Sequence, residues 1–178
     1  MQSLKKIVAI GPESTGKSTL CEFLAGHFKT QWVPEFAREY LLTNGMDYSY
    51  DDLLTIARGQ IELEEVAILR SAGEPLLFID TNMYVMKIWS EFVFGKVDPW
   101  VTEQIACRKY DLYLLCNTDL PWVKDELREY PDLETREKLF QLYKDCLKAQ
   151  KTDWVEIRGD STHRQWMAQE AINDLIAG

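Results

Sequence analysis

The fold is decided by the stretch GPESTGKS, Gly11–Ser18. It completes the pattern G-x-x-x-x-G-K-[ST], in which the glycines let successive backbone N–H groups turn toward phosphate oxygens. Lys17 supplies a point charge for the β- and γ-phosphates, and the Ser18 hydroxyl reaches magnesium. An apolar run precedes the stretch and a helical pattern follows it, as this loop requires. The sequence therefore predicts a P-loop that binds a nucleoside triphosphate with magnesium.

The segments around this loop alternate between strand and helix patterns, which is typical of an α/β fold with a parallel sheet covered on both faces. We expect five strands, with the first near the centre, in a single domain over residues 1–178. The predicted strands are 4–10, 32–33, 76–79, 112–116 and 154–157. The predicted helices begin near residue 17 and at Asp98-Pro99, and cover about 35–43, 50–71, 83–94, 122–129, 133–148 and 164–176.

Composition and charge narrow the function classes. The formal net charge is −9, and an acidic chain is a poor candidate for binding nucleic acid, because phosphate backbones require basic patches. No window approaches the roughly 20 apolar residues that span a bilayer, and no signal sequence is apparent. We therefore expect a cytoplasmic protein with no nucleic-acid or membrane partner. The four cysteines lack C-x-x-C spacing, which favours small buried thiols over a zinc site.

Asp80 ends the buried run LLFID, which is predicted to be a strand. In P-loop enzymes an acid at this place either holds magnesium through water or takes the proton of an attacking hydroxyl. It could instead cap the helix that begins after it. The sequence leaves these three roles open.

Two segments bear on the base of the nucleotide. A GTPase requires N-K-x-D after a later strand, whereas this chain has Asn117-Thr118-Asp119-Leu120, without the lysine and with the aspartate one place early. Guanine specificity is therefore not supported. The last strand ends near Gly159, where a loop could pass over an adenine, although a plain strand–helix turn fits equally well.

The segment of about residues 119–137 is predicted to form a mobile lid of short helices. It carries Arg128 and Arg136, and phosphoryl-transferring kinases often bring lid arginines to the γ-phosphate as charge develops there. The alternative is that both are surface arginines paired with Glu126, Glu129 or Asp132. The sequence does not decide between these readings.

Glu35 and Arg38 follow the second predicted strand, and strand carboxyl ends line the ligand crevice in open α/β sheets. A carboxylate and a guanidinium there could grip the hydroxyls of a second substrate, or they could form an exposed ion pair at a helix start. Aromatic rings near the crevice could stack on a flat substrate ring, although most pack in the core. The candidates are Trp32, Tyr84 and Trp89.

Four segments together are more specific than the P-loop alone: GPESTGKSTL, PEFAREY, FIDT and YDLYLLCNTDLPWVKDELR. With them, nearly the whole chain resembles the ribosylnicotinamide kinase domain of NadR-type NAD-biosynthesis proteins. The resemblance implies a P-loop kinase sandwich with strand order 2-3-1-4-5. It also implies ATP-dependent phosphorylation of the 5′-hydroxyl of nicotinamide riboside, which gives nicotinamide mononucleotide.

The resemblance also implies roles for individual residues. Asp80 would be the base or the magnesium-linked acid, Glu35 and Arg38 would lie at the nucleoside site, and Arg128 and Arg136 would act from the lid. A pyridinium substrate is a cation, which suits stacking on an aromatic face. ATP and magnesium would be held by Gly11, Glu13, Ser14, Thr15, Gly16, Lys17, Ser18 and Thr19.

The chain departs from the family pattern in two places. NadR-type proteins carry an adenylyltransferase domain before the kinase domain, and often a DNA-binding domain. Here the P-loop begins ten residues from the first residue, so we expect neither domain. The lid reads DELR, with Glu126 where a glycine is expected, which could alter lid motion or substrate choice.

The leading hypothesis is thus a nucleoside kinase, with nicotinamide riboside as the acceptor. A kinase of another nucleoside or of a nucleotide is the first alternative. A nucleoside monophosphate would want additional arginines at the crevice, and near the second strand the sequence has only Arg38. The second alternative is a regulatory ATPase or nucleotide switch that acts on a protein partner.

Overall fold

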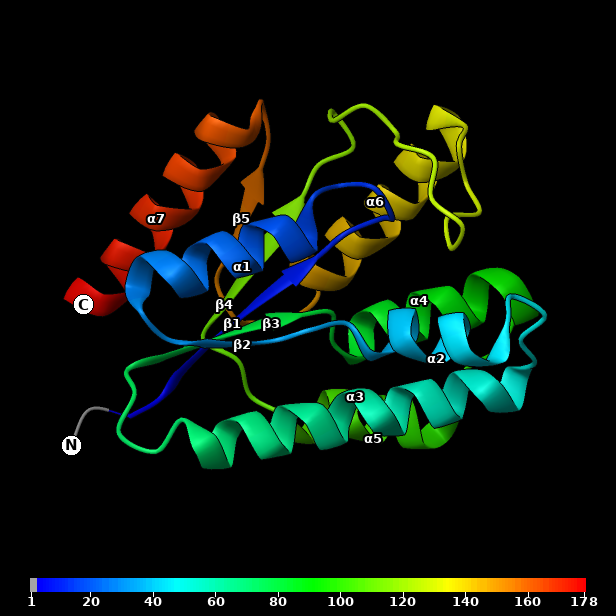
Figure 1. Ribbon diagram of the computed structural model, residues 1–178, viewed down its shortest axis with the longest axis horizontal. Helices are drawn as coiled ribbons and strands as arrows, with labels where there is room; N and C mark the ends of the chain where they lie inside the picture. The colour runs from blue at the N-terminus through cyan, green and yellow to red at the C-terminus, as the bar shows by residue number, and fades with distance from the viewer. Residues whose placement is uncertain (1–2) are drawn as a thin grey trace.

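The parallel sheet predicted from the sequence forms the centre of the fold. The structure, a computed structural model, describes residues 3–178 (Figure 1). The sheet has the order β2-β3-β1-β4-β5, and each neighbouring pair is parallel. This order confirms the prediction. The strands are β1 (Lys5–Ile10), β2 (Gln31–Val33), β3 (Leu76–Asp80), β4 (Leu112–Cys116) and β5 (Trp154–Ile157).

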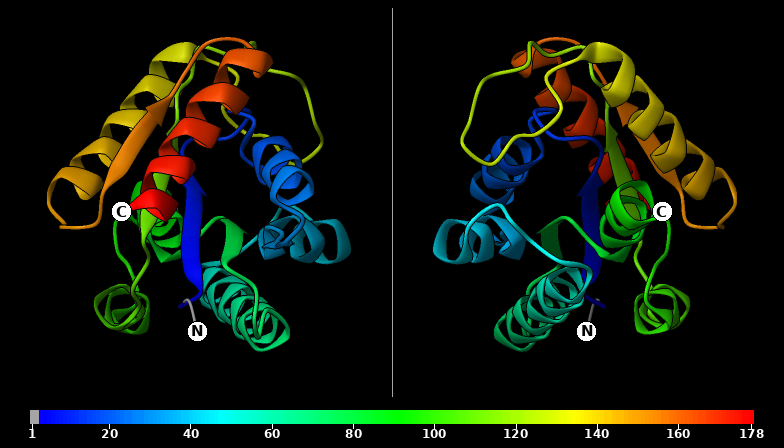
Figure 2. Two further views of the ribbon diagram at one scale, coloured as in Figure 1. Left: turned by 90° about the vertical axis from the view of Figure 1, so that its left-hand side faces the viewer. Right: turned by 90° about the vertical axis from the view of Figure 1, so that its right-hand side faces the viewer.

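Helices cover both faces of the sheet, as two views from opposite sides show (Figure 2). One face packs on α1 (Lys17–Phe28) and α7 (Ser161–Ala177). The other packs on α3 (Tyr50–Arg70), α4 (Met83–Phe94) and α6 (Leu133–Lys148). A further apolar cluster joins α3 and α4 to α2 (Phe36–Asn44) and α5 (Pro99–Cys107). Because β3 and β4 are buried along their whole length, they carry almost no polar side chains.

Short polar side chains start most of these helices. Asp98 accepts the N–H of Trp100 and Asp132 accepts that of Thr135, as an N-cap does, and both starts agree with the sequence prediction. Helix α7 begins three residues earlier than predicted, because Asp160 caps it by accepting the N–H of His163. The predicted helix 122–129 is wrong, since this stretch is a loop with one turn at residues 126–127.

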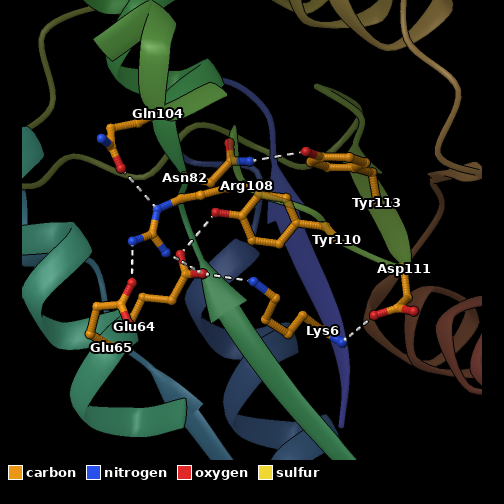
Figure 3. Close-up of polar contacts among 9 residues, drawn as sticks. All are labelled: Lys6, Glu64, Glu65, Asn82, Gln104, Arg108, Tyr110, Asp111 and Tyr113. Carbon is orange, nitrogen blue, oxygen red and sulfur yellow. Dashed lines mark hydrogen bonds and ion pairs between the residues drawn. The ribbon is translucent and has the colours of Figure 1, made fainter. Parts of the chain in front are cut away.

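A buried ion cluster lies at the amino-end edge of the sheet, opposite the P-loop (Figure 3). The Glu64 side chain is 1% exposed and accepts hydrogen bonds from Lys6 Nζ (3.2 Å), Arg108 Nη1 (3.0 Å) and Tyr110 Oη (2.9 Å). Each oxygen of this carboxylate therefore has a partner, as a buried charge requires. The cluster joins α3 to α5 and to the starts of β1 and β4.

The structure also bears on the expectations about membrane spans and about the cysteines. No helix within residues 3–178 is long and apolar enough to cross a membrane. All four cysteines are free thiols, but only Cys21 and Cys116 are fully buried, while Cys107 is exposed. The prediction of buried thiols is therefore wrong for Cys107, which lies at the last position of α5.

Candidate functional site

A cavity of about 230 Å³ opens at the carboxyl end of the sheet, where the P-loop, α2, α4 and the lid meet. Its wall includes every residue from Gly11 to Thr19, together with Glu35 and Arg38. The predicted donor site and the predicted acceptor site therefore belong to one cavity. Apolar and aromatic side chains complete the wall, among them Ile88, Trp89, Phe92, Leu139 and Tyr143.

The two glycines of the P-loop are required for different reasons. Gly11 has φ 144°, and a Cβ there would lie 2.6 Å from the carbonyl oxygen of Cys116 at the end of β4. Gly16 has φ 77° and is the N-cap of α1. The loop can therefore lie close against β4 and then turn directly into a helix whose N-terminus faces the cavity.

Asp80 is held against the P-loop. The Ser18 hydroxyl donates to Asp80 Oδ2 across 2.5 Å, and the Asp80 side chain is almost completely buried. The cap of α4 is Asn82, whose side chain accepts the N–H of Tyr84. The reading of Asp80 as a helix cap is therefore wrong, and its carboxylate bonds the P-loop instead. Asp80 itself lies behind Ser18 and does not line the cavity wall.

Glu35 faces the same buried carboxylate. Burial raises the pKa of Glu35, and the nearby Asp80 charge raises it further, while Lys17, Arg38 and the Thr81 hydroxyl oppose the shift. Burial likewise raises the pKa of Asp80, against the Lys17 charge and the Ser18 and Thr81 hydroxyls. Two carboxylates that repel each other in a desolvated crevice favour the binding of a cation or a proton beside them.

Thr81 is a residue of the site that the sequence analysis did not single out. It has φ 77°, which a β-branched residue rarely adopts, and its side chain is buried. Its hydroxyl donates to Asp80 Oδ1 across 3.4 Å, and the same hydroxyl opposes the rise in the pKa of Glu35. Strain of this kind persists where the surrounding structure enforces it, and here it accompanies a hydroxyl held beside the buried Asp80 carboxylate.

The donor set fits magnesium. Ser18, Asp80 and Glu35 offer only oxygen atoms, which is the ligand type that magnesium prefers. Within residues 3–178 no group of three or more acidic, histidine or cysteine side chains forms a cage for a metal. Magnesium does not need one, because it commonly binds through one or two carboxylates, water and substrate phosphates.

The predicted lid, about residues 119–137, is held to the P-loop by the side chains of Glu13 and Ser14. The Glu13 carboxylate accepts the backbone N–H of Glu129 (2.9 Å) and of Tyr130 (2.6 Å), and the indole N–H of Trp122 (3.3 Å). The Ser14 hydroxyl accepts the N–H of Val123. Two side chains of the P-loop therefore satisfy four donors of this loop, three of them backbone N–H groups.

Arg38 of α2 and Tyr48, which precedes α3, also contact the lid. The Arg38 guanidinium forms a two-point contact with Asp125, at 3.0 and 3.3 Å, so it is not paired with Glu35 as the simpler sequence reading proposed. The Tyr48 hydroxyl donates to Glu129 Oε2 and accepts the indole N–H of Trp89, each at 2.9 Å. The P-loop, α2 and Tyr48 therefore all contact the lid through side chains.

Neither lid arginine forms an ion pair within the part of the chain that the structure describes, so the surface-pair reading is wrong for both. Arg128 lines the cavity and donates from Nη1 to the carbonyl of Val123 at 2.5 Å. Arg136 is 4% exposed, and its Nε and Nη1 atoms have no hydrogen-bond partner. Buried guanidinium nitrogens without a partner are costly, and Arg136, unlike Arg128, does not line the cavity.

The aromatic candidates separate clearly. Trp89 lines the cavity, as predicted. Tyr84 does not: its ring packs edge-on against Tyr113, so the prediction of Tyr84 on the cavity wall is wrong. Tyr113 in turn accepts a hydrogen bond from Asn82 (Figure 3). Trp32 packs against the core on the α1 side. From α4 the cavity is lined by Val85, Ile88, Trp89 and Phe92.

A second, smaller cavity lies beside the P-loop, between Gly16, Leu120 and the start of α7. Arg164 forms its base and was not predicted. It is 4% exposed and donates to the carbonyls of Thr15 (2.9 Å) and Gly159 (2.8 Å) and to the Asp119 carboxylate. Asp119 also accepts the N–H of Gly159, so both its oxygens are engaged. Gly159 thus shapes this rim through its backbone and does not itself line the cavity.

Comparison with known proteins places the chain among P-loop proteins. A family model described as AAA domain matches residues 6–164. The chain is similar to the trifunctional NAD biosynthesis/regulator protein NadR of Salmonella typhimurium (strain LT2) and of Escherichia coli (strain K12), with 28% identity to each. The similarity covers 97% of this chain and 43% of each relative, so the chain spans less than half of their length.

Solved structures share the fold. A crystal structure of NadR protein in complex with NR has a TM-score of 0.81 and 21% identity, over 98% of this chain and half of that one. NadR protein in complex with NAD and AMP-PNP gives 0.75 over the same shares. Thymidylate kinase from Ehrlichia chaffeensis gives 0.69 at 13% identity, over 97% of this chain and 99% of that one. These likenesses show a P-loop fold shared with a nucleotide kinase.

Proposed function

The chain belongs to the AAA domain family, and we propose that within it the protein is a kinase that transfers the γ-phosphoryl group of ATP to the 5′-hydroxyl of a nucleoside. Nicotinamide riboside is the proposed acceptor and nicotinamide mononucleotide the product. One observation carries the proposal: the P-loop Lys17, the lid Arg128 and the carboxylate Glu35 line the same cavity. A phosphate donor and a hydroxyl acceptor can therefore meet there under a lid that excludes water.

The donor end is the P-loop. Its backbone N–H groups and the N-terminus of α1 would hold the phosphates, and Lys17, now bonded to the carbonyl of Pro12, would turn to them. Ser18 and Asp80 would hold magnesium, which neutralises phosphate charge when it is bound. The unpartnered Arg136 and the cavity-lining Arg128 would contact the moving phosphoryl group.

The acceptor end is Glu35. It lies on the cavity wall and has a raised pKa, which suits a base that must take a proton near neutral pH. The acceptor oxygen would attack the γ-phosphorus, the bond to the β-phosphate oxygen would break, and the hydroxyl proton would go to Glu35. Asp80, behind Ser18, is better placed for the magnesium side than for the base, which narrows the roles that the sequence left open.

The choice of nicotinamide riboside is supported by the chemistry of the acceptor wall. Trp89, Phe92 and Tyr130 offer aromatic faces, and Glu129 adds a carboxylate beside them. A flat cationic ring would stack on the aromatic faces and would be attracted by the charge of the carboxylate. Two comparisons support the same acceptor: the NadR relatives, at 28% identity, are named for NAD biosynthesis, and a NadR protein of the same fold was crystallised in complex with NR.

The test is ADP formation with ATP, magnesium and a panel of nucleosides and nucleoside monophosphates. Stimulation by nicotinamide riboside that disappears in Lys17→Ala supports the proposal. Stimulation by a monophosphate instead would favour a nucleotide kinase. Intact ATP binding with no stimulation by any acceptor would overturn the kinase proposal and favour a regulatory ATPase.

A further inference from the structure

Gln60 joins the two segments that carry the cavity carboxylates. It lies in the middle of α3, and its side chain is 1% exposed. Its Oε1 accepts the backbone N–H of Phe36 at 2.8 Å. Its Nε2 lies 3.3 Å from the carbonyl oxygen of Pro34 and 3.4 Å from that of Asp80, and donates to both. One buried amide therefore spans the turn that holds Glu35 and the end of the strand that holds Asp80.

The start of α2 is held by Gln60 and not by the Glu35 side chain. Glu35 is the N-cap of α2, a position where a side chain commonly accepts the N–H of the second or third helical residue, and its carboxylate accepts neither. The first N–H of the helix, that of Phe36, is accepted by Gln60. Gln60 therefore holds the start of α2, while the Glu35 carboxylate lies on the cavity wall and is repelled by the Asp80 charge.

Gly59 shows that α3 is shaped to reach this turn. A Cβ on Gly59 would lie 2.2 Å from a ring carbon of Phe36, so no side chain fits there. Glycine inside a helix costs about 0.5–1 kcal/mol relative to alanine. Gly59 and Gln60 therefore both fit against Phe36. Gly59 leaves room for the Phe36 ring, and the Gln60 amide accepts the Phe36 backbone N–H.

We infer that Gln60 is a positioning residue for phosphoryl transfer, which holds the backbone of Glu35 and Asp80 so that their carboxylates keep the separation that the reaction requires. The inference rests on the proposed kinase function. Displacement of a reacting group by about 1 Å can cost roughly 100-fold in rate. Gln60 itself touches neither reacting group through its side chain, so its effect must pass through Glu35 and Asp80.

The test compares two variants of the same helix. Gln60→Met keeps the volume and removes the three bonds, and we expect kcat to fall about 10- to 100-fold while KM for ATP changes less than about twofold. Glu64→Gln is the matched control, because Glu64 lies one turn further on the same face, equally buried, and bonds at the opposite edge of the sheet. It should lose stability and keep kcat where it is folded. Equal kcat losses in both variants would overturn the inference.

A double-variant cycle separates positioning from general damage. In a Glu35→Gln background, Gln60→Met should reduce kcat clearly less than it does in the wild type, because one of the two carboxylates whose separation it sets is already gone. A full further loss would show that Gln60 supports the fold in general and would overturn the inference.

A crystal structure of Gln60→Met gives a readout that needs no activity. We expect the Glu35 and Asp80 carboxylates to move apart relative to the wild-type crystal structure, and an unchanged separation would refute the inference. If the wild-type protein phosphorylates no acceptor, the kinase proposal fails, while this structural comparison still decides whether Gln60 sets the carboxylate pair.

Discussion

Glu13 Oε1 lies 2.6 Å from the backbone nitrogen of Tyr130, which ties the lid to the P-loop. Because this carboxylate accepts three lid donors, Glu13→Ala should free the lid. We expect hydrogen exchange in residues 122–130 to accelerate at least about tenfold, and KM for the acceptor to rise more than KM for ATP. Mass-spectrometric hydrogen exchange and initial-rate kinetics measure both. Glu22→Ala, on the exposed face of α1, is the control. Unchanged lid exchange would contradict the fastening role.

Asp80→Asn should abolish most activity and stabilise the ligand-free protein at neutral pH. Burial raises the pKa of Asp80 above its ordinary value of 3.8, so the folded state binds the proton more tightly than the unfolded state. Stability is therefore lost as the pH rises from about 4 through the raised pKa. Asparagine removes this loss, so Tm at pH 7 should exceed that of the wild type, and the difference should shrink at pH 4.

Asp52→Asn is the control with the opposite sign. Hydrogen bonds from Ser49 and Tyr40 lower the pKa of Asp52 to about 2. Its contribution is present above the ordinary pKa of 3.8 and is lost as the pH falls toward 2. Asp52→Asn should therefore reduce Tm at pH 7 and match the wild type near pH 2. Thermal unfolding across pH compares both variants, and near-normal turnover of Asp80→Asn would remove Asp80 from the chemistry.

Arg136→Met should make the ligand-free protein more stable and the enzyme slower. The variant removes a buried guanidinium whose Nε and Nη1 have no partner, so the midpoint of urea unfolding should rise. Loss of a charge at the transferring phosphoryl group should lower kcat about 100-fold or more. Lys138→Met, two residues further and exposed, should change neither quantity beyond error. If the midpoint of urea unfolding and kcat are both unchanged, Arg136 is an ordinary core residue.

Gly11→Ala and Gly26→Ala form a matched pair. A methyl group at position 11 would meet the carbonyl of Cys116 at 2.6 Å, with φ at 144°, so the P-loop must shift. We expect ATP binding to weaken at least about tenfold, as measured by calorimetry. At position 26, within α1, a methyl group meets nothing within 4 Å, so alanine should stabilise the helix by about 1 kcal/mol and leave ATP binding unchanged. Equal effects of the two variants would contradict the close packing of the P-loop on β4.

The sequence determined the features that depend on neighbours along the chain. The P-loop pattern, the apolar runs of β1, β3 and β4, and the caps at Asp98 and Asp132 act over a few residues, so their patterns predict them directly. Even the strand order followed, through the family resemblance. The grouping of Glu35, Asp80 and the P-loop was predictable because carboxyl ends of parallel strands meet at one edge.

Tertiary structure alone decided how those segments are held. Glu13 lies 117 residues from Tyr130, and Arg164 lies 149 residues from the Thr15 carbonyl that it binds. No local period encodes such bonds, so the sequence pattern predicted a helix at 122–129 where the structure has a loop bonded to the P-loop. Gln60 likewise gained its role only when α3 packed against the turn after β2. Side-chain pattern therefore fixed where the elements form, and long-range hydrogen bonding fixed which of their polar groups face the cavity.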